Sequence, residues 1–313
     1  MTQDRKFLVI VAAGGVIALF APISSGYYDL LGAALLLGVF AASVDLLWGC
    51  CGVLNLGAAL YFGIGAYSSA ICMRESVGIG VGLALGVILA SAIASAIGFV
   101  CFRSTTSPVQ FGLVGLAASL AAEQCMIRLY GLAGGSNGIS NIGKPDFGWV
   151  GELHANPYFI FTSMIVVLLL ALLIRVRDSH AGKIFRCVRD APQRAQAIGY
   201  SPRRVRLFAS VIAAVISAAA GALYAPFSGI VHPGLFGPTL NVLVLVWVAV
   251  GGQGRIVGPF VCAVGLKLFE SELGSQYSDI HMLIVGALFI TTVLWRPAGI
   301  LSLPAASSNE EAD

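Results

Sequence analysis

Long apolar runs separated by short polar segments dominate this chain of 313 residues and constrain its fold more than any other feature. Hydrophobic residues make up 58% of the sequence, whereas charged residues make up only 11%. Soluble domains carry roughly 25% charged residues, so this chain lacks the charge needed to cover a water-exposed surface. A membrane-spanning helix needs about 20 predominantly apolar residues. We therefore predict an all-α fold, a polytopic membrane helix bundle with a single transmembrane domain over residues 1–313.

Ten apolar runs are candidates for transmembrane helices. They are Phe7–Ile23, Leu30–Trp48, Gly52–Met73, Val77–Phe102, Pro108–Leu129, Tyr158–Val176, Leu207–Ala225, Thr239–Val250, Ile256–Leu273 and Ile280–Trp295. The first run follows Arg5 and Lys6, as in a signal peptide, but apolar runs continue along the whole chain, which favours an uncleaved helix. Small residues recur inside the runs, as in Ser217–Gly221, and they allow helices to approach closely in lipid.

The basic residues are concentrated in one segment. Nine of the 18 Lys and Arg residues lie between Arg175 and Arg206. Cytoplasmic loops of membrane proteins carry an excess of Lys and Arg, so we predict a cytoplasmic loop at about residues 177–206. Counting the runs outward from this loop places both termini in the cytoplasm. The same count places the polar segment at about residues 131–157 outside, where Lys144 is its one cation.

The basic loop has a helix pattern of its own. The sequence predicts a helix from Gly182 to Asp190, a break at Pro192 and a second short helix that ends at Ile198. Gly199 is then expected to have a positive φ, as glycine does after many helix ends. Asp190 is expected to cap the second helix or to pair with a cation of a partner. A loop between spans is usually short, so we interpret this one as a docking surface for a cytoplasmic partner.

Polar side chains inside apolar runs are candidate pathway residues, because each costs a few kcal/mol at mid-membrane unless it is paired or hydrated. Asp45 lies near the cytoplasmic end of its run, where a carboxylate can reach interfacial water. Glu123 has no oppositely charged residue three or four positions away, and Lys267 can pair with Glu270 along one helix face. The candidate pathway residues are Asp45, Asn55, Glu123 and Gln124.

The outer segment contains a cluster of turn formers that tolerate positive φ angles. They are Gly134, Gly135, Ser136, Asn137 and Gly138. We interpret the cluster either as an ordinary turn or as a shaped surface for a soluble partner or for substrate entry.

Motifs of catalysis and of cofactor binding are weak in this sequence. Gly138–Lys144 fits the start of a phosphate-binding loop, but Pro145 stands where a Ser or Thr should bind magnesium, and the segment is expected outside. The seven cysteines show no C-x-x-C spacing, and a net charge of +3 does not favour nucleic-acid binding. We therefore expect a transporter in contact with lipid rather than an enzyme, without a metal site or cofactor of its own. Any ATP that drives transport would be bound by another polypeptide.

Six segments between residues 45 and 299 resemble a known family. They are Asp45–Gly49, Gly52–Gly57 continuing to Phe62–Tyr67, Gly134–Ile139, Gly182–Gly199 followed by Leu207–Tyr224, Val250–Gly254 with Gly258 and Pro259, and Arg296–Gly299. These segments resemble the integral-membrane permeases of ABC importers for branched-chain amino acids, a group that also includes importers of urea and short amides. The resemblance implies a multi-pass protein of the bacterial inner membrane. Its implied partners are a second homologous permease subunit, two cytoplasmic ATPase subunits and a periplasmic solute-binding protein.

The resemblance also implies which residues couple the permease to ATP hydrolysis. In such importers a cytoplasmic loop of the permease fits a groove on the ATPase. The matching residues here are Arg189, Asp190, Ala195, Ala197 and Gly199. The chain departs from the family at Ala58, where a His is common, and at Ala191 and Pro192, which replace a second acidic residue.

Several substrates and mechanisms remain open from the residues alone. Gly134–Gly138 favours branched-chain amino acids, which we expect to be the substrate, whereas Asp45 with Trp48 and Trp247–Gly252 are closer to the urea and amide branch. A secondary transporter could use Glu123 or Asp45 as an ion site, but the long basic loop argues against it. A membrane-embedded enzyme would need a convergent catalytic set, and the sequence contains no Ser/His/Asp or Cys/His arrangement.

Overall fold

Most of the predicted apolar runs form helices in the computed structural model of the chain. The structure describes residues 25–103, 108–145, 157–276 and 286. The expected first and last runs, Phe7–Ile23 and Ile280–Trp295, lie outside these residues apart from residue 286. The long helices are α2 (Ser25–Asp45), α3 (Ala58–Arg74), α4 (Ile79–Arg103), α5 (Pro108–Arg128), α7 (Pro157–Asp178), α10 (Pro202–Ser228), α11 (Pro238–Gly251) and α12 (Val257–Gln276).

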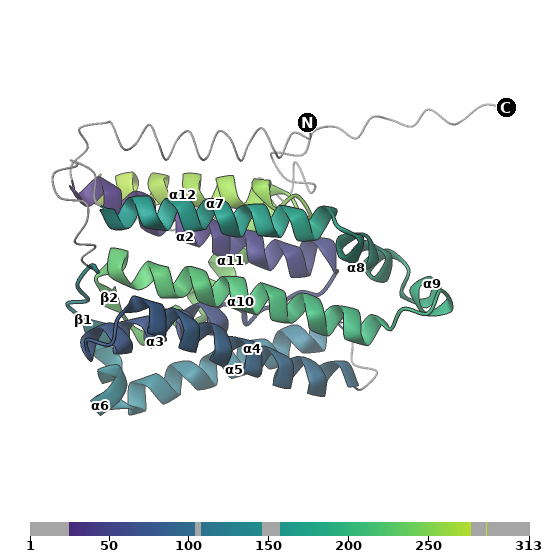
Figure 1. The fold of residues 1–313 in the computed structure, drawn as a ribbon, viewed down its shortest axis with the longest axis horizontal. Helices are drawn as coiled ribbons and strands as arrows, with labels where there is room; N and C mark the ends of the chain where they lie inside the picture. The colour runs from purple at the N-terminus through teal and green to yellow at the C-terminus, as the bar shows by residue number, and fades with distance from the viewer. Residues whose placement is uncertain (1–24, 104–107, 146–156, 277–285, 287–313) are drawn as a thin grey trace.

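Short elements connect these helices at the two ends of the bundle. They are the π-helical turn η1 (Leu46–Cys50), α6 (Tyr130–Ala133), the 3-10 turns η2 (Gly135–Asn137) and η3 (Pro233–Phe236), the strands β1 (Ile139–Ser140) and β2 (Ile230–Val231), and the helices α8 (His180–Asp190) and α9 (Pro192–Ala197). The strands pair antiparallel, with Ile139 opposite Val231. The helices α8 and α9 project beyond one end of the bundle, and the strands lie at the other end (Figure 1). We call these the α8 end and the β1 end.

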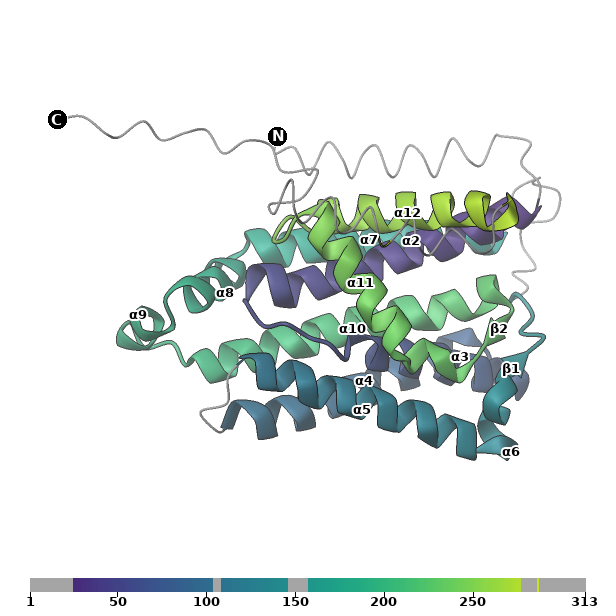
Figure 2. The same ribbon diagram turned by 180° about the vertical axis from the view of Figure 1, so that it is seen from behind.

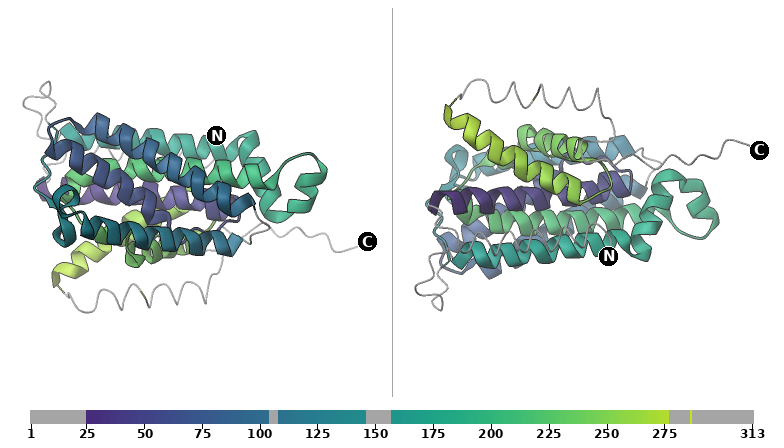
Figure 3. Two further views of the ribbon diagram at one scale, coloured as in Figure 1. Left: turned by 90° about the horizontal axis from the view of Figure 1, so that it is seen from below. Right: turned by 90° about the horizontal axis from the view of Figure 1, so that it is seen from above.

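The described residues are therefore all-α apart from one pair of two-residue strands. Five helical segments in this part of the chain are long and apolar enough to cross a membrane: Gly26–Cys50, Ile79–Phe102, Gln110–Arg128, Pro157–Asp178 and Pro202–Ser228. The helices α2, α4, α5, α7 and α10 run roughly along one direction, as a membrane bundle requires (Figure 3). The helix α12 carries its three charged residues, Lys267, Glu270 and Glu272, within the helix, whereas the charges of α7 and α10 lie at one end of each helix.

The centre of the bundle is formed by α2 and α10, which are mostly buried, whereas α4, α5 and α7 leave most of their surface open. The small residues Ser217–Gly221 of α10 are buried, as predicted, and α10 passes very close to α3. Aromatic rings fill the space around this contact. Phe62 of α3 lies between Phe40 of α2 and Tyr224 of α10, with ring centroids 4.9 and 5.3 Å apart.

The prediction of a helix over Gly52–Met73 is wrong for its first six residues. Residues 52–57 are not helical, and α3 begins only at Ala58. The side chain of Asn55 accepts a hydrogen bond from the Gly57 N–H at 3.0 Å, a local bond that competes with the helical backbone pattern. The chain thus runs back into the bundle as irregular backbone before α3 starts (Figure 2).

The helix α11 also starts inside the bundle. It has 14 residues, about 21 Å at 1.5 Å per residue, and a hydrocarbon core is about 30 Å thick. The strand β2, His232 and the turn η3 run between the end of α10 and its first residue. Figure 2 shows α11 crossing the bundle obliquely. Both α3 and α11 are thus interrupted helices, and irregular backbone of this kind is tolerated in membranes where protein buries it.

Candidate functional site

The predicted pair of short helices is confirmed in the segment between α7 and α10. The helix α8 ends at Asp190 and α9 begins at Pro192, while α7 and α10 extend farther than expected and leave Ser179–Ser201 between them. One face of α8 packs against the bundle through Gly182, Phe185 and Val188, which are buried at a spacing of three residues. The opposite face exposes basic side chains, including Lys183 and Arg186.

The end of α9 forms a Schellman motif around Gly199. The Tyr200 N–H donates to the Ala195 carbonyl at 3.0 Å, and the Gly199 N–H donates to the Gln196 carbonyl at 2.9 Å. Gly199 has φ +93°, so its predicted positive φ is confirmed. This motif closes α9 into a compact tip.

The tip of α9 presents an apolar residue to the outside. Ala195 is buried and fixes α9 to its surroundings, whereas Ala197 and Gly199 are exposed. Ile198 has 70% of its surface exposed, and the Tyr200 hydroxyl lies 3.1 Å from His180 Nε2 at the start of α8. Sequence reasoning missed Ile198, because one isoleucine at a helix end carries no signal by itself. An exposed, rigid apolar tip of this kind is suited to fill a groove of a partner.

Arg189 and Asp190 form an ion pair rather than a cap. The Arg189 Nε donates to Asp190 Oδ1 at 2.8 Å, and this hydrogen bond lowers the pKa of the exposed Asp190 carboxyl from its ordinary value. The expectation that Asp190 caps the second helix is wrong, because the residue at the N-cap of α9 is Ala191 and no side chain caps this end.

Arg189 also reaches the bundle. Its Nη1 donates to the Gly49 carbonyl of η1 at 2.5 Å. Gly49 is in turn enclosed, since a Cβ at this position would overlap Asp45 Oδ1 and the Gly254 nitrogen. A residue larger than glycine would therefore separate three segments that meet at this point.

Asp45 connects the end of α2 to the loop between α11 and α12. Its side chain is fully buried, and its two oxygens accept hydrogen bonds from the Gly254 N–H at 2.7 Å and the Ile256 N–H at 2.9 Å. The expectation that Asp45 reaches interfacial water is therefore wrong. We call Asp45, Gly49, Arg189, Gly254 and Ile256 the latch.

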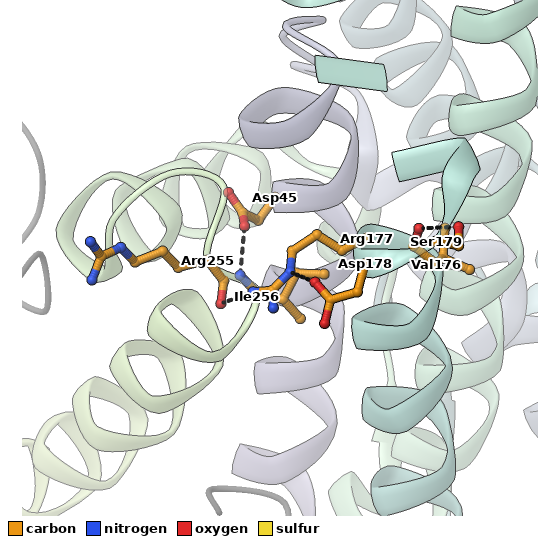
Figure 4. A network of polar contacts seen from close by, with 7 residues as sticks. All are labelled: Asp45, Val176, Arg177, Asp178, Ser179, Arg255 and Ile256. Carbon is orange, nitrogen blue, oxygen red and sulfur yellow. Dashed lines mark hydrogen bonds and ion pairs between the residues drawn. The ribbon is translucent and has the colours of Figure 1, made fainter. Parts of the chain in front are cut away.

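The end of α7 contacts the same loop. Arg177 donates from Nη1 to the Arg255 carbonyl at 3.4 Å and from Nε to Asp178 Oδ1 at 2.9 Å. Figure 4 shows Asp45 and Arg177 on two helices that converge on Arg255 and Ile256. The segment that carries α8 is thus joined to α2 and to the α11–α12 loop by hydrogen bonds, so its displacement can be transmitted to both.

The intramembrane candidates lie in different surroundings. Asn55 is buried and bonds Gly57, Glu123 is half-buried, and Gln124 is exposed, whereas Asp45 bonds the α11–α12 loop. A Cβ at Gly237, the residue before α11, would lie 3.5 Å from both carboxylate oxygens of Glu123. Lys267 and Glu270 pair as predicted, at 3.3 Å.

Sequence reasoning missed two buried polar residues near the starts of α3 and α11. Asn241 accepts a hydrogen bond from the Ala59 N–H at 2.9 Å and donates to Ser119 Oγ at 3.2 Å. Ser119 Oγ donates to the Phe236 carbonyl at 2.7 Å. Both residues are isolated polar positions in apolar runs, and only the fold brings them together.

The turn cluster at the β1 end has the predicted backbone conformation. Gly134, Gly135 and Gly138 have φ angles of +75°, +65° and +71°. Ser136 and Asn137 are exposed on η2 between them. The following strand β1 pairs with β2, so this turn is held against the segment that leads into α11. Lys144, four residues after β1, forms an ion pair with Asp29 near the start of α2 at 2.5 Å.

Comparison with known proteins decides the family. Residues 26–293 match the family described as the permease component of branched-chain amino acid transport systems. The chain belongs to this family. It is 25% identical over 328 residues to the high-affinity branched-chain amino acid transport system permease protein LivM of Escherichia coli strain K12, covering 96% of this chain and 76% of the relative.

A second permease protein of the same type is also similar. The high-affinity branched-chain amino acid transport system permease protein LivH of Salmonella typhimurium is 26% identical over 284 residues, covering 85% of this chain and 91% of the relative. No solved structure matches the chain. In this permease, two of the segments that resemble the family, Asp45–Gly49 and Val250–Gly254, are distant in sequence but meet in the latch.

Proposed function

We propose that this permease is the transmembrane subunit of an ATP-driven importer and forms the pathway for branched-chain amino acids. The observation that carries the proposal is the family match over residues 26–293, combined with an exposed α9 tip that the latch ties to the bundle. The substrate is that named for the LivM and LivH relatives. ATP is bound by partner subunits, and the permease lies in the bacterial inner membrane.

The partners are assigned to the two ends of the bundle. One of the two ATPase subunits contacts the α8 end, where Ile198, Ala197 and Gly199 are exposed and Arg189 connects the loop to the latch. A periplasmic solute-binding protein contacts the β1 end at Gly134–Gly138, where Ser136 and Asn137 are exposed.

The pathway is formed with a second permease subunit along α5. The exposed large hydrophobic residues of α4 and α7, such as Leu85, Ile88 and Leu168, suit lipid. The helix α5 is the least hydrophobic of the five spans and carries the half-buried Glu123 and the exposed Gln124. Polar side chains in a span are costly in lipid, so this face is better matched by water or protein. The interrupted helices α3 and α11 lie beside it, and such helices form substrate sites in other transporters.

The topology consists of ten transmembrane helices in one domain with both termini in the cytoplasm. Its support is the nine Lys and Arg residues around α8, which favour a cytoplasmic α8 end.

Co-purification with candidate ATPases tests the function. The wild-type permease should assemble with them, and the reconstituted complex should hydrolyse ATP faster when substrate-loaded binding protein is added. An assembled complex that never responds to any branched-chain amino acid would contradict the proposal.

The orientation predicts a labelling pattern in intact spheroplasts. Single cysteines replace Ser140 on β1 and Gln196 on α9, both exposed, in a background without the exposed Cys125. An impermeant thiol reagent should label the cysteine at position 140 and should reach position 196 only after the membrane is permeabilised. The reverse pattern would overturn the orientation.

The ion pair of Lys144 predicts a neutral substitution. Lys144→Ala should leave ATP hydrolysis by the assembled complex unchanged, because Lys144 pairs with Asp29 near the β1 end and half-exposed pairs contribute only about 0–1 kcal/mol. Asp29→Asn is the matched control and should behave alike. If Lys144→Ala abolished hydrolysis while Asp29→Asn did not, Lys144 would act on nucleotide after all.

A further inference from the structure

One buried amide joins the two interrupted helices. Asn241 lies in the first turn of α11, with only 2% of its surface exposed. Its Oδ1 accepts from the Ala59 N–H at the start of α3, and its Nδ2 donates to Ser119 Oγ of α5 and, at 3.1 Å, to the Gly237 carbonyl. The first N–H groups of a helix have no partner within the helix. Asn241 therefore supplies an acceptor for one of the first N–H groups of α3, which follows a non-helical segment.

The same region is connected to the β1 end by a short piece of chain. The strand β2 pairs with β1, which directly follows the turn Gly134–Gly138, and a Cβ at Gly138 would overlap the Val231 carbonyl. From Val231 only His232, η3 and Gly237 separate β2 from α11. A displacement of the turn thus reaches the start of α11 through closely packed backbone.

The other end of α11 leads into the latch. The helix ends at Gly251, and the loop that follows donates two backbone hydrogen bonds to Asp45. A helix is a rigid element, so movement of its start is carried over about 21 Å to its end. Within the described residues, α11 therefore links the surface assigned to the binding protein with the segment assigned to the ATPases.

We propose that Asn241 is a positioning residue that makes the starts of α3 and α11 move as one unit when the binding protein engages the β1 end. This role rests on the proposed function. Without the Asn241 amide, α11 loses its bonds to Ala59 and Ser119 while the latch and the α9 tip are untouched. The loss should therefore affect transmission from the β1 end rather than ATP hydrolysis itself.

The test compares two buried polar deletions in the fully assembled complex. Asn241→Ala should keep assembly and basal ATP hydrolysis, while its stimulation by substrate-loaded binding protein falls about fivefold or more, a normal size for coupling between sites. Ser217→Ala is the matched control, because Ser217 is equally buried. Its hydroxyl makes a hydrogen bond of 2.7 Å with Ser43 of α2, in another part of the bundle. Ser217→Ala should retain full stimulation.

Three results would overturn the role of Asn241. One is full stimulation and uptake with Asn241→Ala, and another is an equal loss in both variants, which would indicate a general packing effect. The third result applies if Asn241→Ala does not assemble. Ser119→Ala then replaces it, because it removes one partner of the same amide, and full stimulation in Ser119→Ala would overturn the role. A wild-type complex without any stimulation would instead contradict the proposed function itself.

Discussion

Replacing Asp45 by alanine is expected to destabilise the permease more than any other single substitution considered for it. The change leaves the N–H groups of Gly254 and Ile256 without their acceptor, and each unsatisfied buried donor costs about 1–3 kcal/mol. The loop between α11 and α12 would then separate from α2. The midpoint of thermal unfolding of the purified protein in detergent should fall clearly, and Asp45→Asn, which keeps one acceptor oxygen, should have an intermediate effect.

Glu270→Ala is the matched control for Asp45→Ala. Glu270 is also a carboxylate on a long helix, but it is half-exposed and its partner among the described residues is Lys267, so its loss should shift the unfolding midpoint little. If Asp45→Ala and Glu270→Ala unfolded at the same temperature as the wild type, the latch would not be the joint that the hydrogen bonds indicate.

Replacing Gly199 by valine is expected to uncouple the permease from its ATPases while leaving the bundle folded. Gly199 has φ +93°, and a residue with a side chain in such a conformation costs roughly 1 kcal/mol or more. A Cβ at Gly199 would meet nothing within 4 Å, so the cost comes from the backbone alone and can be relieved by opening the Schellman motif. The α9 tip would then present Ile198 in another direction. Co-purified ATPase should decrease, or ATP hydrolysis should continue without uptake.

Gln196→Val separates backbone strain from the added side chain. Gln196 is exposed on the same short helix, so valine there adds the same bulk without a positive φ. It should retain assembly and transport. Normal assembly and uptake in Gly199→Val would exclude the α9 tip as the coupling element, and the basic loop would then only indicate topology.

The sequence predicts the helices better than it predicts the contacts between them. The apolar runs and the Pro192 break predicted α8 and α9 because helix periodicity and capping are local properties. The positive φ of Gly199 was predictable for the same reason. By contrast, the non-helical residues 52–57 were predicted as helix, because their apolar composition outweighed the weak turn signal of Asn55.

The sites depend on distant residues that no local pattern reveals. The carboxylate of Asp45 is buried because Gly254 and Ile256 fold onto it from the other side of the bundle. In the sequence, Asn241 and Ser119 are two isolated polar residues. Only the packing of α5 against α11 shows that they form a hydrogen bond with each other. Resemblance to the family identified the segments around Asp45 and Gly254 but not that they touch.

Uptake by the reconstituted complex tests the central claim most directly. The permease, its partner permease and their ATPases are placed in proteoliposomes that contain ATP, with solute-binding protein outside. We expect ATP-dependent accumulation of radiolabelled leucine that excess valine or isoleucine reduces and that excess urea does not. Accumulation of urea or a short amide in place of leucine would contradict the assigned substrate, and leucine accumulation without ATP would contradict an ATP-driven importer.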